Sequence, residues 1–166
     1  MSDDLRADQA LVPTLIDRLM DDNPDGPSDA DPLRVYSVKA MRMALKRDLE
    51  ALLNTRRRSH SVPRDLEEVQ GSLLNYGLID VTNSRSRSEM IGTDLGRMLA
   101  NALMQFEPRL SSIKVTSCDN ADPLDRSQRF RIEAVLNVEP APELVCFDSV
   151  VEPVNAGFKV READDV

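Results

Sequence analysis

The spacing of apolar residues changes once along this chain, at Pro108. Before Pro108 they recur at helical intervals, and after it they alternate with polar residues, as in strands that bury one face. Proline lacks a backbone N–H and keeps the residue before it out of helical geometry, so Pro108 ends the helical part. Helices followed by a small antiparallel β-meander predict an α+β fold in a single domain.

Three main helices are predicted before Pro108. Residues 10–21 carry apolar side chains at helical spacing and predict an N-terminal amphipathic helix. Residues 38–54 show the strongest pattern, and Ser37 is placed to cap their N-terminus. Residues 89–106 predict a helix with a wide apolar face, in which Gly96 suggests close packing against a neighbouring element.

The connecting segments are shorter and more polar. A short helix is expected to open at Pro63, and Gly77 is expected at a helix end or turn with a left-handed backbone. Residues 81–88 predict a polar loop. Four apolar residues around Gly77 are expected in the core: Leu73, Leu74, Leu78 and Ile79.

After Pro108 four strands are predicted. Residues 110–118 and 144–151 are two of them, and residues 157–161 form a short fourth. Residues 128–138 alternate strictly and give the clearest strand signal, with Phe130, Ile132, Ala134, Leu136 and Val138 on one face.

These elements divide the chain into successive parts. Residues 34–161 form the predicted α+β domain, preceded by the helix at 10–21 and an acidic linker at 22–33. Residues 1–9 are expected to be flexible, and residues 162–166 form a tail.

Charge is distributed unevenly along the chain, whose net charge is −8. Residues 1–33 hold nine acids and two arginines, whereas residues 34–64 hold nine bases and two acids. An acidic chain is a poor ligand for nucleic acid, but such a division suits docking between proteins. No apolar run approaches the ~20 residues that a membrane span needs, and the start of the chain has no apolar core of a secretory signal.

The residues that usually carry catalysis or bind metals are scarce. The one histidine, His60, cannot supply a histidine metal site or a catalytic triad alone, and it is expected in an exposed loop. Cys118 and Cys146 fall on predicted strands, where buried thiols are expected, and two cysteines make no disulfide framework. No cofactor and no metal are therefore expected, and a reducing cytosol is the simplest setting.

Carboxylates leave one enzymatic possibility. Glu107, with Asp119 or Asp122, could form the acid pair of a glycosidase. Sugar clefts usually offer aromatic platforms, and this chain has no tryptophan, two tyrosines and four phenylalanines. We therefore do not expect an enzyme.

Five segments, in order, resemble one family. The most distinctive is Phe106-Glu107-Pro108-Arg109-Leu110, a helix end that leads directly into the meander. The chain resembles the baseplate wedge proteins of contractile injection machines, which include the TssE subunits of type VI secretion systems and the small "lysozyme-like" wedge proteins of phages. The other four segments are LIDRL at 15–19, RDLEALLNTR at 47–56, SLLNYGL at 72–78 and FRIEA at 130–134.

The resemblance implies a structural subunit without catalytic activity. It implies that the chain joins the TssF–TssG wedge near TssK and anchors the first ring of the TssB–TssC sheath, with no nucleic acid and no small-molecule substrate. It also implies a cytoplasmic location, in a baseplate docked at the inner membrane. Glu107, Pro108 and Arg109 would then be partner-binding residues.

Physical arguments add two mechanisms and leave alternatives open. Pro108 would hold Glu107 and Arg109 at a rigid corner, where they can pair with each other or with a partner. An exposed edge of the meander could accept strands of sheath subunits. A lysozyme-like peptidoglycan hydrolase and an adaptor unrelated to secretion remain alternatives. The sequence does not show which strand is the edge, or whether the helix at 10–21 docks on its own domain or on a partner.

Overall fold

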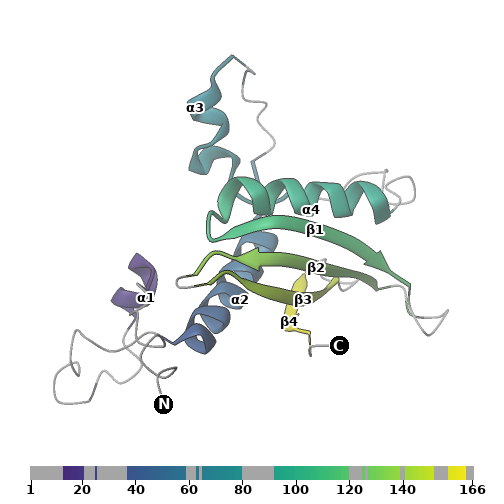
Figure 1. Cartoon of the computed structure of the whole chain (residues 1–166). Helices are drawn as coiled ribbons and strands as arrows, with labels where there is room; N and C mark the ends of the chain where they lie inside the picture. The colour runs from purple at the N-terminus through teal and green to yellow at the C-terminus, as the bar shows by residue number, and fades with distance from the viewer. Residues whose placement is uncertain are drawn as a thin grey trace.

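Four antiparallel strands form one sheet in the order β1-β2-β3-β4 (Figure 1). They are β1 (Leu110–Cys118), β2 (Gln128–Leu136), β3 (Glu143–Val151) and β4 (Phe158–Glu162). Each strand pairs with the next in the chain, so β1 and β4 are the two outer strands. The predicted meander, and with it the α+β fold, is confirmed.

This computed structural model describes residues 13–20, 25, 37–58, 63, 65–79, 92–119, 125, 127–138, 141–151 and 157–163. Within these ranges the helices are α1 (Leu15–Leu19), α2 (Val38–Asn54), α3 (Glu67–Gln70), the 3-10 turn η2 (Leu73–Asn75) and α4 (Gly92–Phe106).

The core lies between one face of the sheet and the two long helices. Phe130, Ile132, Ala134 and Leu136 of β2 are buried, as their alternation predicts. Leucines of α2 and α4 that are fully buried complete this core: Leu45, Leu49, Leu99 and Leu103. Each such side chain contributes about 1.5–3 kcal/mol when it leaves water. The opposite face of the sheet carries charged side chains, including the Arg131–Asp148 pair between β2 and β3.

Helix α2 has the predicted bounds. The Oγ of Ser37 accepts a hydrogen bond from the N–H of Ala40 at 3.1 Å, which satisfies one free donor of the first turn. Helix α4 ends at Phe106, directly before Glu107-Pro108, also as predicted; residues 89–91 of that prediction lie outside the described residues.

The N-terminal helix is shorter than predicted. Helix α1 begins at Leu15 because Thr14 caps it: the Thr14 hydroxyl accepts from the N–H of Asp17, and Asp17 bonds back to the N–H of Thr14. Pro13 therefore precedes the helix, and Met20 is already extended. None of the residues of α1 is buried.

Three of the four apolar residues expected around Gly77 are not in the core. Leu73, Leu74 and Ile79 are exposed, and only Leu78 is buried. They belong to a segment that projects away from the sheet at the top of Figure 1. The short helix there also begins later than expected, at Glu67 rather than near Pro63.

Other sequence predictions meet the structure only in part. The register of β1 against β2 shifts between Ser111 and Lys114, a bulge that the alternation of the sequence does not predict. Glu162, assigned to the tail, ends β4. The division of the chain into parts stays a prediction, because residues 1–9, most of the linker at 22–33, the loop at 81–88, His60 and Asp122 lie outside the described residues.

Candidate functional site

Glu107, Pro108 and Arg109 form a tight corner between α4 and β1. The N–H of Glu107 still donates to the carbonyl of Leu103 at 2.9 Å, as in one more turn of helix. The N–H of Leu110 then donates back to the carbonyl of Glu107 at 3.2 Å. The corner is fixed by backbone hydrogen bonds on both sides of the exposed Pro108.

Arg109 holds the carboxylate of Glu107 with a two-pronged contact. Its Nε donates to Oε1 and its Nη2 to Oε2, each at 2.6 Å. Glu107 is only 6% exposed, so this is a buried ion pair. Hydrogen bonds to both oxygens offset the free-energy cost of burying a charged carboxylate, whereas burying an unpaired carboxylate would destabilise the fold.

The pair continues into a longer chain of alternating charges. The Nη2 of Arg109 also donates to Oδ2 of Asp48 at 2.8 Å. Arg47 donates to the other oxygen of Asp48 at 2.8 Å and to Oδ1 of Asp17 at 2.7 Å. We call these five residues the corner charge network; it joins α1, α2 and the corner.

The network perturbs the protonation of its neighbours. Burial disfavours the charged guanidinium of Arg109, but the hydrogen bonds and charges of Glu107 and Asp48 outweigh it and raise its pKa. Burial also raises the pKa of the Tyr76 hydroxyl above its usual value, and the negative charges of Asp48 and Glu107 add to that shift. The Tyr76 ring meets Phe106 edge to face, with centroids 5.2 Å apart.

A second junction locks the segment after α3 to the end of α2. Gly77 has a φ of 96°, the left-handed geometry predicted for it, and a Cβ there would collide with the carbonyl of Thr55. The N–H of Leu78 donates to that carbonyl at 2.8 Å, and the N–H of Arg57 donates to the carbonyl of Leu78 at 2.7 Å. Four of the five segments that carry the family resemblance thus meet at the network or at this junction.

The outer strands of the sheet differ in the hydrogen bonding of their outward backbone groups. On β4, the side-chain amide of Asn54 donates to the carbonyl of Phe158 and accepts from its N–H, both at 2.9 Å. Next to β1, the N–H of Asn137 donates to the carbonyl of Arg109, so the backbone of Asn137 faces β1. Every second residue of β2 before Asn137 then also faces β1. From the register, Lys114, Thr116 and Cys118 turn their peptide groups toward β2, so Val115 and Ser117 turn theirs outward.

Of the two candidate acid pairs for hydrolysis, the one that lies within the described residues, Glu107 with Asp119, is not brought together. Glu107 precedes β1 and Asp119 follows it, so nine strand residues, about 30 Å at ~3.3 Å per residue, separate them. The two carboxylates of a glycosidase lie ~5–9.5 Å apart. Cys118 and Cys146 lie on different strands, form no disulfide and are half-buried rather than buried as expected, and the described part of the chain holds no cluster of metal ligands.

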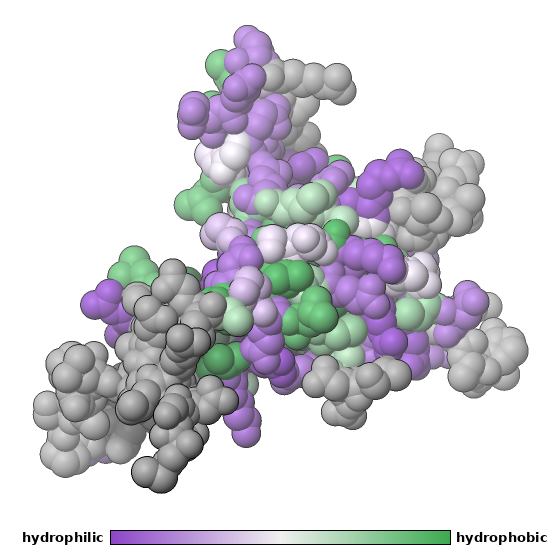
Figure 2. Space-filling view, viewed as in Figure 1, coloured by the Kyte–Doolittle hydropathy of each residue, from purple (hydrophilic) through white to green (hydrophobic). Residues whose placement is uncertain are grey.

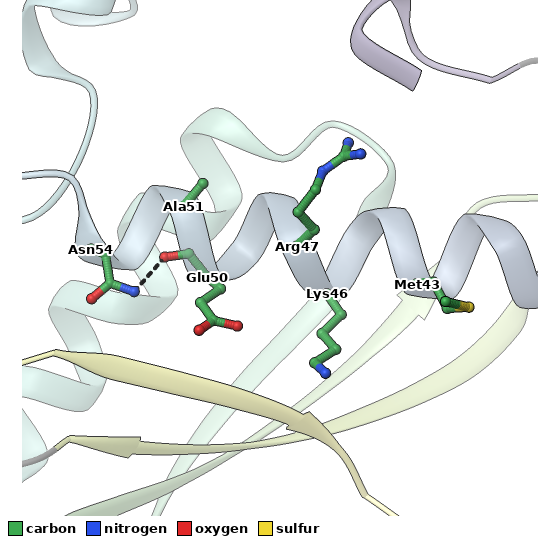
Figure 3. A pocket seen from close by; sticks show the side chains of 6 residues that line it. All are labelled: Met43, Lys46, Arg47, Glu50, Ala51 and Asn54. Atoms are coloured by element: carbon green, nitrogen blue, oxygen red, sulfur yellow. Dashed lines mark hydrogen bonds between the residues drawn. The ribbon is translucent and has the colours of Figure 1, made fainter. Parts of the chain in front are cut away.

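A shallow pocket of about 410 Å³ lies along the outer side of α2 (Figure 3). Its described lining comes from one helix and mixes methionine, lysine, arginine, glutamate and asparagine. The Nδ2 of Asn54 donates there to the carbonyl of Glu50 at 2.8 Å. This lining brings no acid–base pair or nucleophile together, and we assign no chemistry to it. It comprises Met43, Lys46, Arg47, Glu50, Ala51 and Asn54.

A local sequence signal marks the corner but not its other partners. The sequence predicts Arg47 on a polar face of the helix at 38–54, Asp48 in local ion pairs there, and Tyr76 beside a turn, and the Arg47–Asp48 pair agrees with this. The pairs Asp17–Arg47 and Asp48–Arg109 are 30 and 61 residues apart in the chain, and periodicity carries no information on contacts at that range. Their only sequence signal was that opposite charges stood in the segments resembling one family.

Comparisons with known proteins agree with the resemblance. The family model for baseplate wedge protein gp25 matches residues 39–141, more than half of the chain. The match covers α2, α4, the corner, β1 and β2. Neither the curated proteins nor the solved structures gave a match. None of the described helices is both long and apolar enough to cross a membrane.

Proposed function

The chain belongs to the baseplate wedge protein gp25 family, and we propose that it is a non-enzymatic structural subunit of a type VI secretion baseplate. The family match over residues 39–141 carries this proposal. It gives a phage or type VI baseplate role, and the resemblance to TssE favours the secretion system. In this proposal the subunit works in the cytoplasm, in a baseplate docked at the inner membrane, and joins TssF, TssG and TssK.

The geometry of Glu107 supports an assembly role over hydrolysis. A general acid or base must reach its substrate, but both oxygens of Glu107 are taken by Arg109 and the residue is buried. The nearest described carboxylate, Asp48, is bridged to Glu107 by the Nη2 of Arg109 and is also held by Arg47, so neither acid is placed to act on a substrate. The lysozyme-like alternative has no supporting observation in the described residues.

We further propose that the corner is an assembly contact. Pro108 is exposed between two residues whose side chains are fixed by their mutual ion pair. A partner would meet a rigid surface here and lose little conformational entropy on binding. In this view Glu107 and Arg109 act mainly by holding the corner in shape, and Pro108 makes the contact.

The sheath is proposed to bind at the edge of β1. Val115 and Ser117 direct N–H and C=O groups away from β2, which is what an added strand requires. The corresponding groups of Phe158 on β4 are already occupied by Asn54. The bulge between Ser111 and Lys114 interrupts the strand, so an added strand would pair regularly only with the second half of β1.

Co-purification from the native host tests the assignment. Tagged wild-type protein is expected to recover TssF, TssG and TssK and to release no fragments from purified peptidoglycan. The variant P108A should keep its circular dichroism spectrum and lose part of these partners, whereas P142A, an exposed proline beside β3, should keep them. Recovery of none of these proteins, or hydrolysis that disappears in E107Q, would overturn the proposal.

A further inference from the structure

The segment between α2 and α4 presents leucines to solvent. Leu73 is 85% exposed and Leu74 57%, and Leu66 and Ile79 are also about half exposed. We call residues 65–79 the leucine arm. Figure 2 shows hydrophobic surface on this arm, beside hydrophilic surface, at the top of the molecule. Four large apolar side chains exposed on one 15-residue segment make this arm a candidate interaction site.

The arm is held in place rather than loosely attached. Asn75 is buried, and its Nδ2 donates to the carbonyl of Gln70 at 3.0 Å and to the side chain of Gln70 at 3.1 Å. Gln105 of α4 donates to the same Gln70 carbonyl at 2.5 Å. Tyr76 packs on Phe106 of α4. The leucines are therefore exposed by a fixed backbone, which favours binding because little order must be gained.

Acidic side chains flank Leu66 in the chain. Asp65, Glu67 and Glu68 are exposed on the same short stretch as Leu66. Residues 63–79 contain these three acids and one base, Arg64, so the arm is net acidic by sequence. An acidic and apolar surface complements a segment that carries lysine or arginine beside apolar anchors.

We propose that the leucine arm is a docking surface for a basic amphipathic segment of another protein. Leu73 and Leu74 would pack against its apolar side chains, and Glu67 and Glu68 would face its cations. The inference does not depend on the proposed sheath or corner contacts, because none of these residues lies on the edge of β1 or at the corner.

Site-specific photocrosslinking in the native host tests this, with the full chain carrying a photoreactive residue at Leu66. The crosslinked peptide is sequenced by mass spectrometry. We expect a segment of another protein with apolar residues at helical spacing and at least two lysines or arginines beside them. Crosslinks to a second copy of this chain, to an acidic or uncharged segment, or to nothing would overturn the proposal.

Variants test the two parts of the surface separately. The double substitutions L73S with L74S, and E67K with E68K, should each lower the crosslinked yield at least tenfold without changing the melting temperature, because these side chains are exposed. L144S is the matched control, since Leu144 on β3 is 77% exposed and far from the arm in sequence. Unchanged yield in either double variant, or an equal loss in L144S, would contradict the assignment.

Discussion

Replacing Glu107 by glutamine removes one charge from the buried pair at the corner while nearly preserving its shape. Removing one partner of a buried ion pair costs about 3–5 kcal/mol. Arg109 keeps its bond to Asp48, and the glutamine carbonyl can keep one of the donors of Arg109. A hydrogen bond to a charged group is worth ~1.5–3 kcal/mol, so the bonds that remain reduce the cost. We therefore expect E107Q to lose about 2–4 kcal/mol of unfolding free energy. For a chain of this size that is a fall in melting temperature of about 4–16 °C.

Urea denaturation followed by circular dichroism measures this loss, and an exposed pair provides the control. Lys114 and Glu133 form an ion pair at 3.3 Å, with side chains 72% and 50% exposed. Such pairs contribute about 0–1 kcal/mol, so E133Q should cost no more than that. A loss below about 1 kcal/mol in E107Q would refute the reasoning that the Glu107–Arg109 pair is buried and stabilises the corner.

A double-mutant cycle separates the pair from its parts. E107L combined with R109M removes both charges and leaves apolar side chains of similar size, so Asp48 still has Arg47. We expect the double variant to be more stable than the sum of the single losses predicts, by about 0.5–3 kcal/mol. Strict additivity would mean that the two side chains do not act as a unit.

The remaining predictions concern glycines, the β4 edge and a tyrosine. G77A should be destabilised by about 1–2 kcal/mol or more because residue 77 has a left-handed backbone. G96A should be stabilised by up to ~1 kcal/mol, since the added Cβ would come no closer than 3.8 Å to Phe130. Thermal unfolding of the two variants compares these effects. N54A should lose about 1–3 kcal/mol because the edge of β4 loses two hydrogen bonds, and native-state hydrogen exchange should show faster exchange of the Phe158 amide. The hydroxyl of Tyr76 should titrate above pH 10 in the ultraviolet spectrum of a Y36F background; because its pKa is raised on folding, stability should be full below pH 10 and fall as the pH rises through the folded pKa.

Elements with a regular apolar period could be read from the sequence. Helix α2 begins after Ser37 and ends at Asn54 as predicted, because one stripe of leucines and a capping hydroxyl define it. Strand β2 alternates strictly, and its alternate side chains are buried accordingly. The change from helix to strand was predicted correctly at Pro108, since a proline restricts the backbone of the residues next to it.

Elements without a regular period could not be read so well. Leu73 and Leu74 stand next to each other in a short turn, so no spacing indicates whether they face the core, and the structure exposes both. The bulge at β1 follows from a φ of 51° at Ser112, a conformation that serine rarely adopts and that the sequence did not signal.

The corner of the candidate site could be predicted from the sequence, but its links to the helices could not. The corner residues Glu107, Pro108 and Arg109 are adjacent in sequence, and their mutual pairing was one of two outcomes considered. Their link to Asp48 and, through Arg47, to α1 depends on how the helices pack, which no local pattern encodes. The burial of Glu107 likewise depends on tertiary packing. From the sequence alone, a glutamate beside a proline is expected at the surface.

Assembly of the sheath in the native host tests the central claim most directly. The host lacks its own copy of this chain, carries a fluorescent sheath subunit, and is complemented with wild type, S117P or S117T. Proline at position 117 removes an outward N–H of β1 and fixes its own φ, whereas threonine keeps the N–H and a hydroxyl. We predict sheaths with wild type and S117T, and none with S117P, although S117P remains folded and still recovers TssF and TssG. Normal sheath assembly with S117P would contradict docking at the edge of β1, and normal assembly without any copy of this chain would contradict its role in the baseplate.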